Sequence, residues 1–134
     1  MLQKDYFLRL VEEFAQALIW LQNKKDREKK LEEMRLMYQR YLGGPYEFYH
    51  TATLEEAVDA ISQYPENERF QRLEMLAELY YAECPLHSLP IRQQLLEKAY
   101  AIFYYCDQHS GLFSMERQQK IMNIQNEMNK ASQA

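Results

Sequence analysis

The stretch LEMLAELY, residues 73 to 80, decides the predicted fold. Its large apolar residues, one small residue and one aromatic residue recur with the period of a helix that buries one face. An earlier stretch, VEEFAQAL at 11 to 18, repeats this pattern, and LEEMRLMY at 31 to 38 aligns with LEKAYAIF at 96 to 103. The chain therefore reads as two copies of a helical unit, which stack because neither copy can bury its apolar faces alone.

Caps and breakers predict where the helices begin and end. Asp26 opens the second helix, Gly43 ends it, and the capping box Thr53-Leu-Glu-Glu56 opens the third. Six helices are expected at about residues 5–23, 26–42, 53–64, 67–83, 91–107 and 114–134. We therefore expect an all-α single domain over residues 1–134, a six-helix bundle of two stacked three-helix units large enough for its own hydrophobic core.

Composition and charge exclude several classes of protein. The net charge of −4 argues against a nucleic-acid partner, which requires a basic surface to neutralise phosphates. No run of 18 apolar residues is present, so no membrane span is expected. The acidic, amphipathic N-terminus lacks the features of a signal peptide, and two cysteines in such a chain predict a reducing cytoplasm.

The first helix carries an unusually wide apolar arc. Its polar positions form one narrow stripe, Arg9, Glu12, Glu13 and Gln16, and nearly all other positions are apolar. A helix of this kind is covered on more than one side, by neighbouring helices or by a second subunit. Homodimerisation through this helix is therefore one expectation, compatible with any function of the chain.

The aromatic stretch GGPYEFYH, residues 43 to 50, has two interpretations. Its aromatic residues either plug the core over the open end of a helix pair or form an exposed binding lip. Alternation along an extended segment would send Tyr46 and Phe48 into the core and Tyr49 outward. Tyr49 and His50 are therefore the expected partner contacts of this segment.

Two C-x-x-H spacings, Cys84 to His87 and Cys106 to His109, have the ligand types of a zinc site. At ~1.5 Å per residue they lie roughly 24 Å apart, at opposite ends of a helical hairpin. One ion cannot bridge that distance, and each pair alone is an incomplete site. We therefore predict neither a metal nor a cofactor, and no disulfide between the two cysteines.

No catalytic motif is recognisable. The chain has no phosphate-binding glycine loop and no H-E-x-x-H, and its single E-x-x-H, Glu47 to His50, does not make the two such motifs of the di-iron bundles. The cysteine–histidine pairs lack oxyanion-hole glycines and an orienting carboxylate. No catalytic residue is assigned, and a non-catalytic role is expected.

The apolar spacing resembles that of a tetratricopeptide repeat. The residues that carry this resemblance are Leu73, Leu76, Ala77 and Tyr80 in one helix and Ala99, Phe103 and Cys106 in the next. The chain is also similar to a family of short bacterial proteins of unknown function, through MLQKDYFLRLVEEFAQAL, RLEMLAELYYAE and FSMERQQKI. That second resemblance implies an all-helical, repeat-like fold and a bacterial cytoplasm, and no functional residues.

The tetratricopeptide resemblance implies a groove for an extended peptide on the inner face of the first helices. The residues on that face would be Arg9, Glu12, Gln16, Ile19, Gln71, Glu74, Glu78 and Tyr81. This face is mostly acidic or neutral, so the partner would be neutral or basic. We expect a protein–protein interaction module that binds a peptide or helix. The alternative is a small-ligand-binding or enzymatic bundle with an internal pocket.

Overall fold

The computed structural model describes residues 2–133, and all of its regular structure there is helical. The helices are α1 (Leu2–Gln22), α2 (Arg27–Leu42), α3 (Tyr46–Thr51), α4 (Leu54–Ile61), α5 (Arg69–Glu83), α6 (Ile91–His109) and α7 (Met115–Gln133). Two short 3-10 turns, η1 (Glu66–Glu68) and η2 (Cys84–Leu86), flank α5. The all-α prediction is confirmed, but within the described part seven helices replace the six expected.

The predicted caps are present. The Asp26 carboxylate accepts hydrogen bonds from the backbone N–H groups of Glu28 and Lys29 at 3.0 and 3.2 Å. Gly43 ends α2 in the left-handed conformation, with φ of 70°. Thr53 and Glu56 form the reciprocal capping box at the start of α4. These local interactions satisfy backbone groups that the helix ends would otherwise leave without partners.

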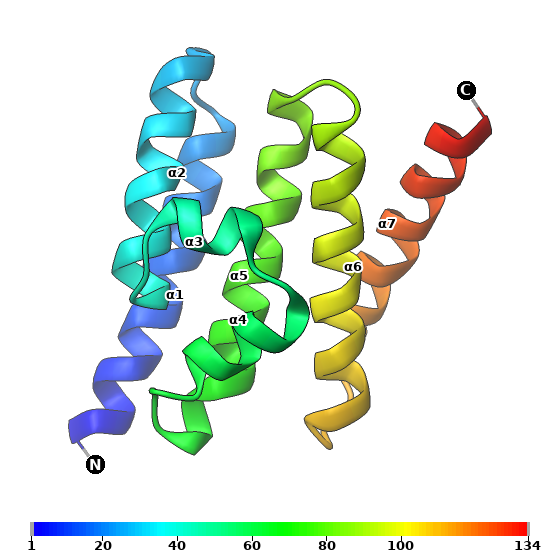
Figure 1. Cartoon of the computed structure of the whole chain (residues 1–134). Helices are drawn as coiled ribbons and strands as arrows, with labels where there is room; N and C mark the ends of the chain where they lie inside the picture. The colour runs from blue at the N-terminus through cyan, green and yellow to red at the C-terminus, as the bar shows by residue number, and fades with distance from the viewer. Residues whose placement is uncertain (1, 134) are drawn as a thin grey trace.

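The long helices alternate in direction (Figure 1). Followed by colour along the chain, α1, α5 and α7 run one way, and α2 and α6 run the other way. α1 packs against α2 and α5, α5 packs against α2 and α6, and α7 packs against α6. α4 was expected to complete the first three-helix unit, but it packs against α5 and α6 instead. The division into two three-helix units is therefore not confirmed.

The core is rich in tyrosine. Tyr38, Tyr41, Tyr49 and Tyr80 are among its largest fully buried side chains. A buried phenol needs a partner for its hydroxyl, and the chain provides them. The Tyr49 hydroxyl donates to the Leu42 carbonyl at 2.8 Å, and the Tyr80 hydroxyl donates to the Tyr49 carbonyl. The core is thus held by hydrogen bonds as well as by apolar contact.

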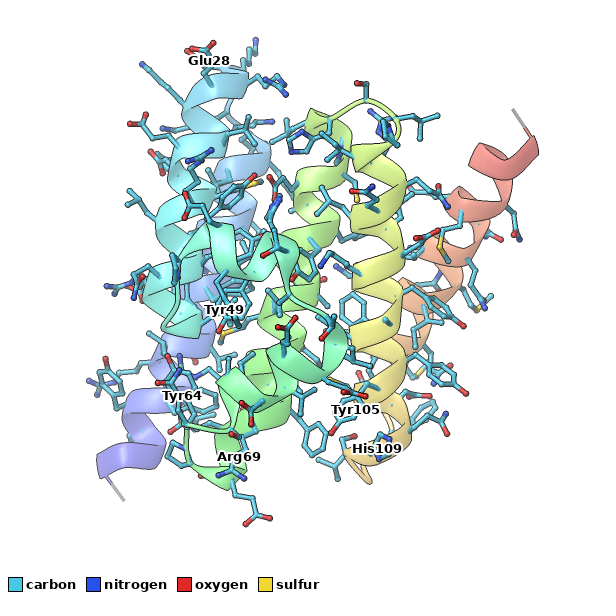
Figure 2. The ribbon with its side chains drawn as sticks, viewed as in Figure 1. Glu28, Tyr49, Tyr64, Arg69, Tyr105 and His109 are labelled. Atoms are coloured by element: carbon cyan, nitrogen blue, oxygen red, sulfur yellow. The ribbon has the colours of Figure 1, made fainter. Side chains whose placement is uncertain are left out.

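The aromatic stretch is the main correction to the predicted fold. Residues 46–51 form helix α3, not an extended loop. Because a helix turns every 3.6 residues, side chains do not alternate between faces as they would in a strand. Tyr49 is fully buried and Phe48 is only partly buried, so the predicted exposure of Tyr49 is wrong. Figure 2 labels Tyr49 on α3. The stretch contributes to the core, in line with the plug interpretation.

Helix α1 is covered on one side only. Phe7, Leu10, Phe14, Leu18 and Leu21 enter the core, where α2 and α5 pack against the helix. The large apolar residues that stay exposed on α1 are Tyr6, Leu8, Ile19 and Trp20. The wide apolar arc of α1 is therefore only partly buried within one chain.

Substitutions in α3 test the burial pattern. Tyr49→Ala should lower the free energy of unfolding by about 3–5 kcal/mol, and Phe48→Ala by about half as much, because the cost of truncation follows burial and the cavity left behind. Chemical denaturation of the two variants measures both losses. A larger loss of stability for Phe48→Ala than for Tyr49→Ala would support the extended arrangement predicted from the sequence and would contradict helix α3.

Candidate functional site

A groove lies between the parallel helices α1, α5 and α7. Its first part is a cavity of about 230 Å³ between Val11, Phe14 and Ala15 of α1, the Gln71–Glu78 face of α5 and the first turns of α7. Its second part, of about 360 Å³, lies further along α1 and α5. It is lined by Leu18 and Gln22 of α1, Tyr81 and Ala82 of α5 and Glu127 of α7, and also by Lys30 and Met34 of α2 and the turn η2. Both parts are open to solvent, so we call the whole the α1–α5–α7 groove.

The α1 wall of the groove is apolar. Leu8 and Ile19 are exposed, and Ala15 lines the first cavity. Eleven residues make about three helical turns, so Leu8 and Ile19 lie on the same side of α1 as Ala15. The wall therefore presents an apolar stripe to anything that lies in the groove.

Ion pairs cross the floor of the groove. Arg117 of α7 lies 3.3 Å from Glu74 and 3.1 Å from Asp107, and Lys120 lies 2.6 Å from Glu78. Burial raises the pKa of Glu74, and this outweighs the opposing effect of Arg117. The floor is thus neutralised by α7, which corrects the expectation of an acidic face there.

Two carboxylates of α7 line the groove without a salt bridge to the described residues. Glu116 lines the first cavity and Glu127 the second, and both are exposed. Lys30 of α2 also lines the second cavity. The unpaired acidic charge of the groove therefore comes from α7, while the floor carries paired charges. This distribution favours a neutral or basic occupant.

Four of the ten residues predicted to contact a partner line the groove, and all four belong to α5. Gln71, Glu74 and Glu78 line its first part and Tyr81 its second. Glu12 and Ile19 are exposed on α1 but line neither cavity. Arg9 and Gln16 are exposed on α1 but line neither cavity. Tyr49 and His50 belong to α3, away from the groove, and Tyr49 is buried.

A second cluster surrounds the buried carboxylate of Glu83, at the end of α5. Its oxygen Oε1 is 2.7 Å from the Tyr46 hydroxyl and 3.0 Å from His87 Nε2. Its oxygen Oε2 is 3.1 Å from the Tyr38 hydroxyl and 2.8 Å from His50 Nε2. Glu83 itself is 0% exposed, and the two histidines are nearly buried.

The four donors keep Glu83 ionised. Burial alone would raise its pKa, but hydrogen bonds from His50, His87 and Tyr46 lower it below the ordinary value of 4.5. Burial, and after it the Glu83 carboxylate, raises the pKa of Tyr38 and of Tyr46. Both phenols therefore remain protonated donors.

The Glu83 cluster is a structural network. Each carboxylate oxygen already accepts two hydrogen bonds, so no acceptor position is left for a substrate. Within the described residues, no three histidine, cysteine or carboxylate side chains are grouped so as to hold a metal ion. The cluster instead joins α2, α3, α5 and the turn η2.

Sequence reasoning missed this cluster. The only local signal is the Glu83–His87 pair, four residues apart, which is one helical turn. Tyr38, Tyr46 and His50 come from helices distant in the chain, so no sequence motif joins them to Glu83.

The cysteine–histidine pairs serve other contacts. Cys84 and Cys106 are buried free thiols, and burial raises the pKa of each to about 12. Neither is a reactive thiolate at neutral pH. His87 is bound to Glu83, and His109 packs on the Tyr105 ring with centroids 4.5 Å apart (Figure 2).

Comparisons with protein-family models, with curated proteins and with solved structures each return no match for this chain. The two resemblances drawn from the sequence therefore stay predictions. Across residues 2–133, none of the helices combines the length and the apolar character needed to cross a bilayer.

Replacing Glu83 tests the network directly. In Glu83→Gln, an amide NH₂ would replace one carboxylate oxygen and would face the two hydrogen-bond donors that this oxygen now accepts from. Because donors cannot pair with each other, the free energy of unfolding should fall by about 2–4 kcal/mol. Denaturation at neutral pH measures this loss, and Glu97→Gln, an exposed position on α6, is the matched control. An equal effect of both substitutions would contradict the network.

The lowered pKa of Glu83 predicts that its contribution to stability depends on pH. The pKa of Glu83 is lower in the folded chain than its ordinary value of 4.5. Its stabilising contribution is therefore complete above pH 4.5 and is lost as the pH falls through the folded-state pKa. The stability difference between the wild type and Glu83→Gln should shrink below pH 4.5, as measured by denaturation at several pH values. A stability difference that increased below pH 4.5 would mean that folding raises the pKa of Glu83 and does not lower it.

Proposed function

We propose that this chain is a non-catalytic protein–protein interaction module, which holds a peptide or helix of its partner in the α1–α5–α7 groove. The observation that carries the proposal is that two cavities open to solvent follow one another along the parallel helices α1 and α5, and that α7 lines part of each. Inner faces of parallel helices form the binding surface in helical-repeat proteins. The resemblance to a tetratricopeptide repeat supports the same interpretation, and the bacterial cytoplasm is its proposed location.

The partner segment is amphipathic. Its apolar side lies on the stripe of Leu8, Ala15 and Ile19, since exposed apolar side chains supply most of the energy of such contacts. Its polar side carries basic residues, which meet Glu116 in the first cavity and Glu127 in the second. Charge thus selects and orients the partner, whereas the apolar stripe gives most of the affinity.

The module is favoured over an enzymatic bundle by the state of the polar groups. The Glu83 cluster converges on one buried point, as catalytic groups do, but its donors and acceptors satisfy each other. The groove, in contrast, holds unpaired charge and exposed apolar surface.

Selection of peptides on the immobilised full chain tests the proposal. Basic amphipathic peptides should be enriched from a displayed random library. Their affinity, measured by fluorescence anisotropy, should fall about tenfold or more, roughly 1.4 kcal/mol, for Ala15→Arg. This exposed position lines the groove, so the longer cationic side chain obstructs it and repels a basic peptide.

Gln39→Arg is the matched control, because it adds the same charge at an exposed position of α2 outside the groove. It should leave the affinity unchanged. Peptides that bind Ala15→Arg as tightly as the wild type would show that they use another surface, and the proposal would fail.

A further inference from the structure

A third cavity is separate from the α1–α5–α7 groove. It has a volume of about 380 Å³ and lies between α6 and the connection from α3 to α4. Helix α4 packs against both α5 and α6 in this region (Figure 1). None of the residues that line this cavity lines either part of the groove. We call this cavity the α4–α6 pocket.

The side chain of Lys98 places an amine at the wall of this pocket. Lys98 belongs to α6, and its Nζ donates to the Ala52 carbonyl at 2.5 Å. The same nitrogen lies 5.6 Å from the centroid of the Tyr80 ring. Ala52 and Tyr80 line the pocket, as Lys98 itself does. The amine is therefore positioned by two elements besides its own helix.

Lys98 has no counter-ion in direct contact. Lys24 and Lys120 lie 3.0 and 2.6 Å from carboxylate oxygens, whereas no carboxylate of the described residues forms a salt bridge with Lys98. Lys98 is half-buried. Burial lowers its pKa below the ordinary value of 10.5, and Glu56 opposes this effect only in part. The neutral amine is therefore formed more readily here than on a fully solvated lysine.

The contact with Ala52 is compatible with either protonation state. A carbonyl oxygen can accept one N–H from an ammonium group or from a neutral amine. Loss of a proton therefore leaves the Lys98 nitrogen in place and frees a lone pair that Ala52 does not use. This lone pair is the nucleophile when a lysine reacts with a carbonyl carbon.

The other walls of the pocket indicate the class of ligand. Glu97 lines the pocket, and Glu56 lies near enough to act on Lys98, so an anionic ligand would be repelled by two carboxylates. A neutral ligand meets no such repulsion, and its hydrocarbon part can contact apolar side chains. The apolar aliphatic residues of the pocket are Ala52, Leu54, Ala57, Ala101 and Ile102.

We propose that the α4–α6 pocket binds a small neutral aldehyde, which condenses with Lys98. The lone pair of Nζ attacks the carbonyl carbon, and a proton passes from the nitrogen to the oxygen to give a carbinolamine. The carbon–oxygen bond then breaks as the C=N bond forms. The oxygen leaves as water, with both of its hydrogens taken from the amine. Because water is the leaving group, the condensation needs no oxidant, no reductant and no second substrate.

Reductive alkylation of the full chain tests this site. Butanal and cyanoborohydride are added at neutral pH, so that each imine is trapped as a secondary amine, and peptide mass spectrometry follows each lysine. The initial rate at Lys98 should exceed that at Lys29, an exposed residue of α2, about tenfold or more, because the pocket holds the aldehyde beside the amine. The rate at Lys98 should also saturate with butanal concentration, whereas the rate at Lys29 should rise in proportion to it.

Gln94→Trp tests whether the pocket is responsible. Gln94 is exposed and lines the pocket one helical turn before Lys98, so an indole there obstructs the pocket and leaves the amine in place. The rate at Lys98 should then fall to that at Lys29. Gln108→Trp, at an exposed position of α6 outside the pocket, is the matched control and should keep the fast, saturable reaction. Both variants should melt as the wild type does.

Two results would overturn the proposal. The first is a wild-type rate at Lys98 no higher than that at Lys29. The second is a fast rate at Lys98 that does not saturate or that Gln94→Trp leaves unchanged, because the amine would then be reactive without a binding site.

Discussion

One buried carboxylate constrains the whole arrangement. A charge removed from water is tolerated only when donors surround it, and Glu83 has four. They come from α2, from α3 and from the turn after α5, so three separate segments must meet at one point for the charge to be stable. The loss of any donor leaves the others around an under-satisfied charge. The geometry of α3 is therefore set by α5, far away in the chain.

Helix α3 shows what this constraint achieves. A helix of six residues is unstable alone, because nucleation costs more than so few hydrogen bonds return. Here it is held from both sides. Tyr46 and His50 reach Glu83, while the Tyr49 hydroxyl binds the Leu42 carbonyl. The helix is thus stabilised by side chains in the core and not by its own propensity.

The sequence predicted what is decided locally. The cap at Asp26, the capping box at Thr53 and the periodic stretch at 73 to 80 all depend on neighbouring residues, and each lies where expected. Helix α3 was missed because glycine, proline and aromatics do not show a helical period over so few residues. The Glu83 cluster was missed because its members meet only after folding. The groove was predicted only in part. Helical spacing predicted the face of α5 that forms its floor, but not the ion pairs that α7 makes with that face.

The direction of the three groove helices has one further consequence. Each helix carries a macrodipole equivalent to roughly half a positive charge at its N-terminus and half a negative charge at its C-terminus. Because α1, α5 and α7 start at the same end of the molecule (Figure 1), their free N–H groups lie at one end of the groove and their free C=O groups at the other. The antiparallel helices α2 and α6 oppose the summed dipole, so the difference in potential is confined to the terminal turns at the groove's two ends. A helix that lies there antiparallel to α5 is electrostatically favoured over the same helix reversed, so the groove distinguishes the two ends of its occupant.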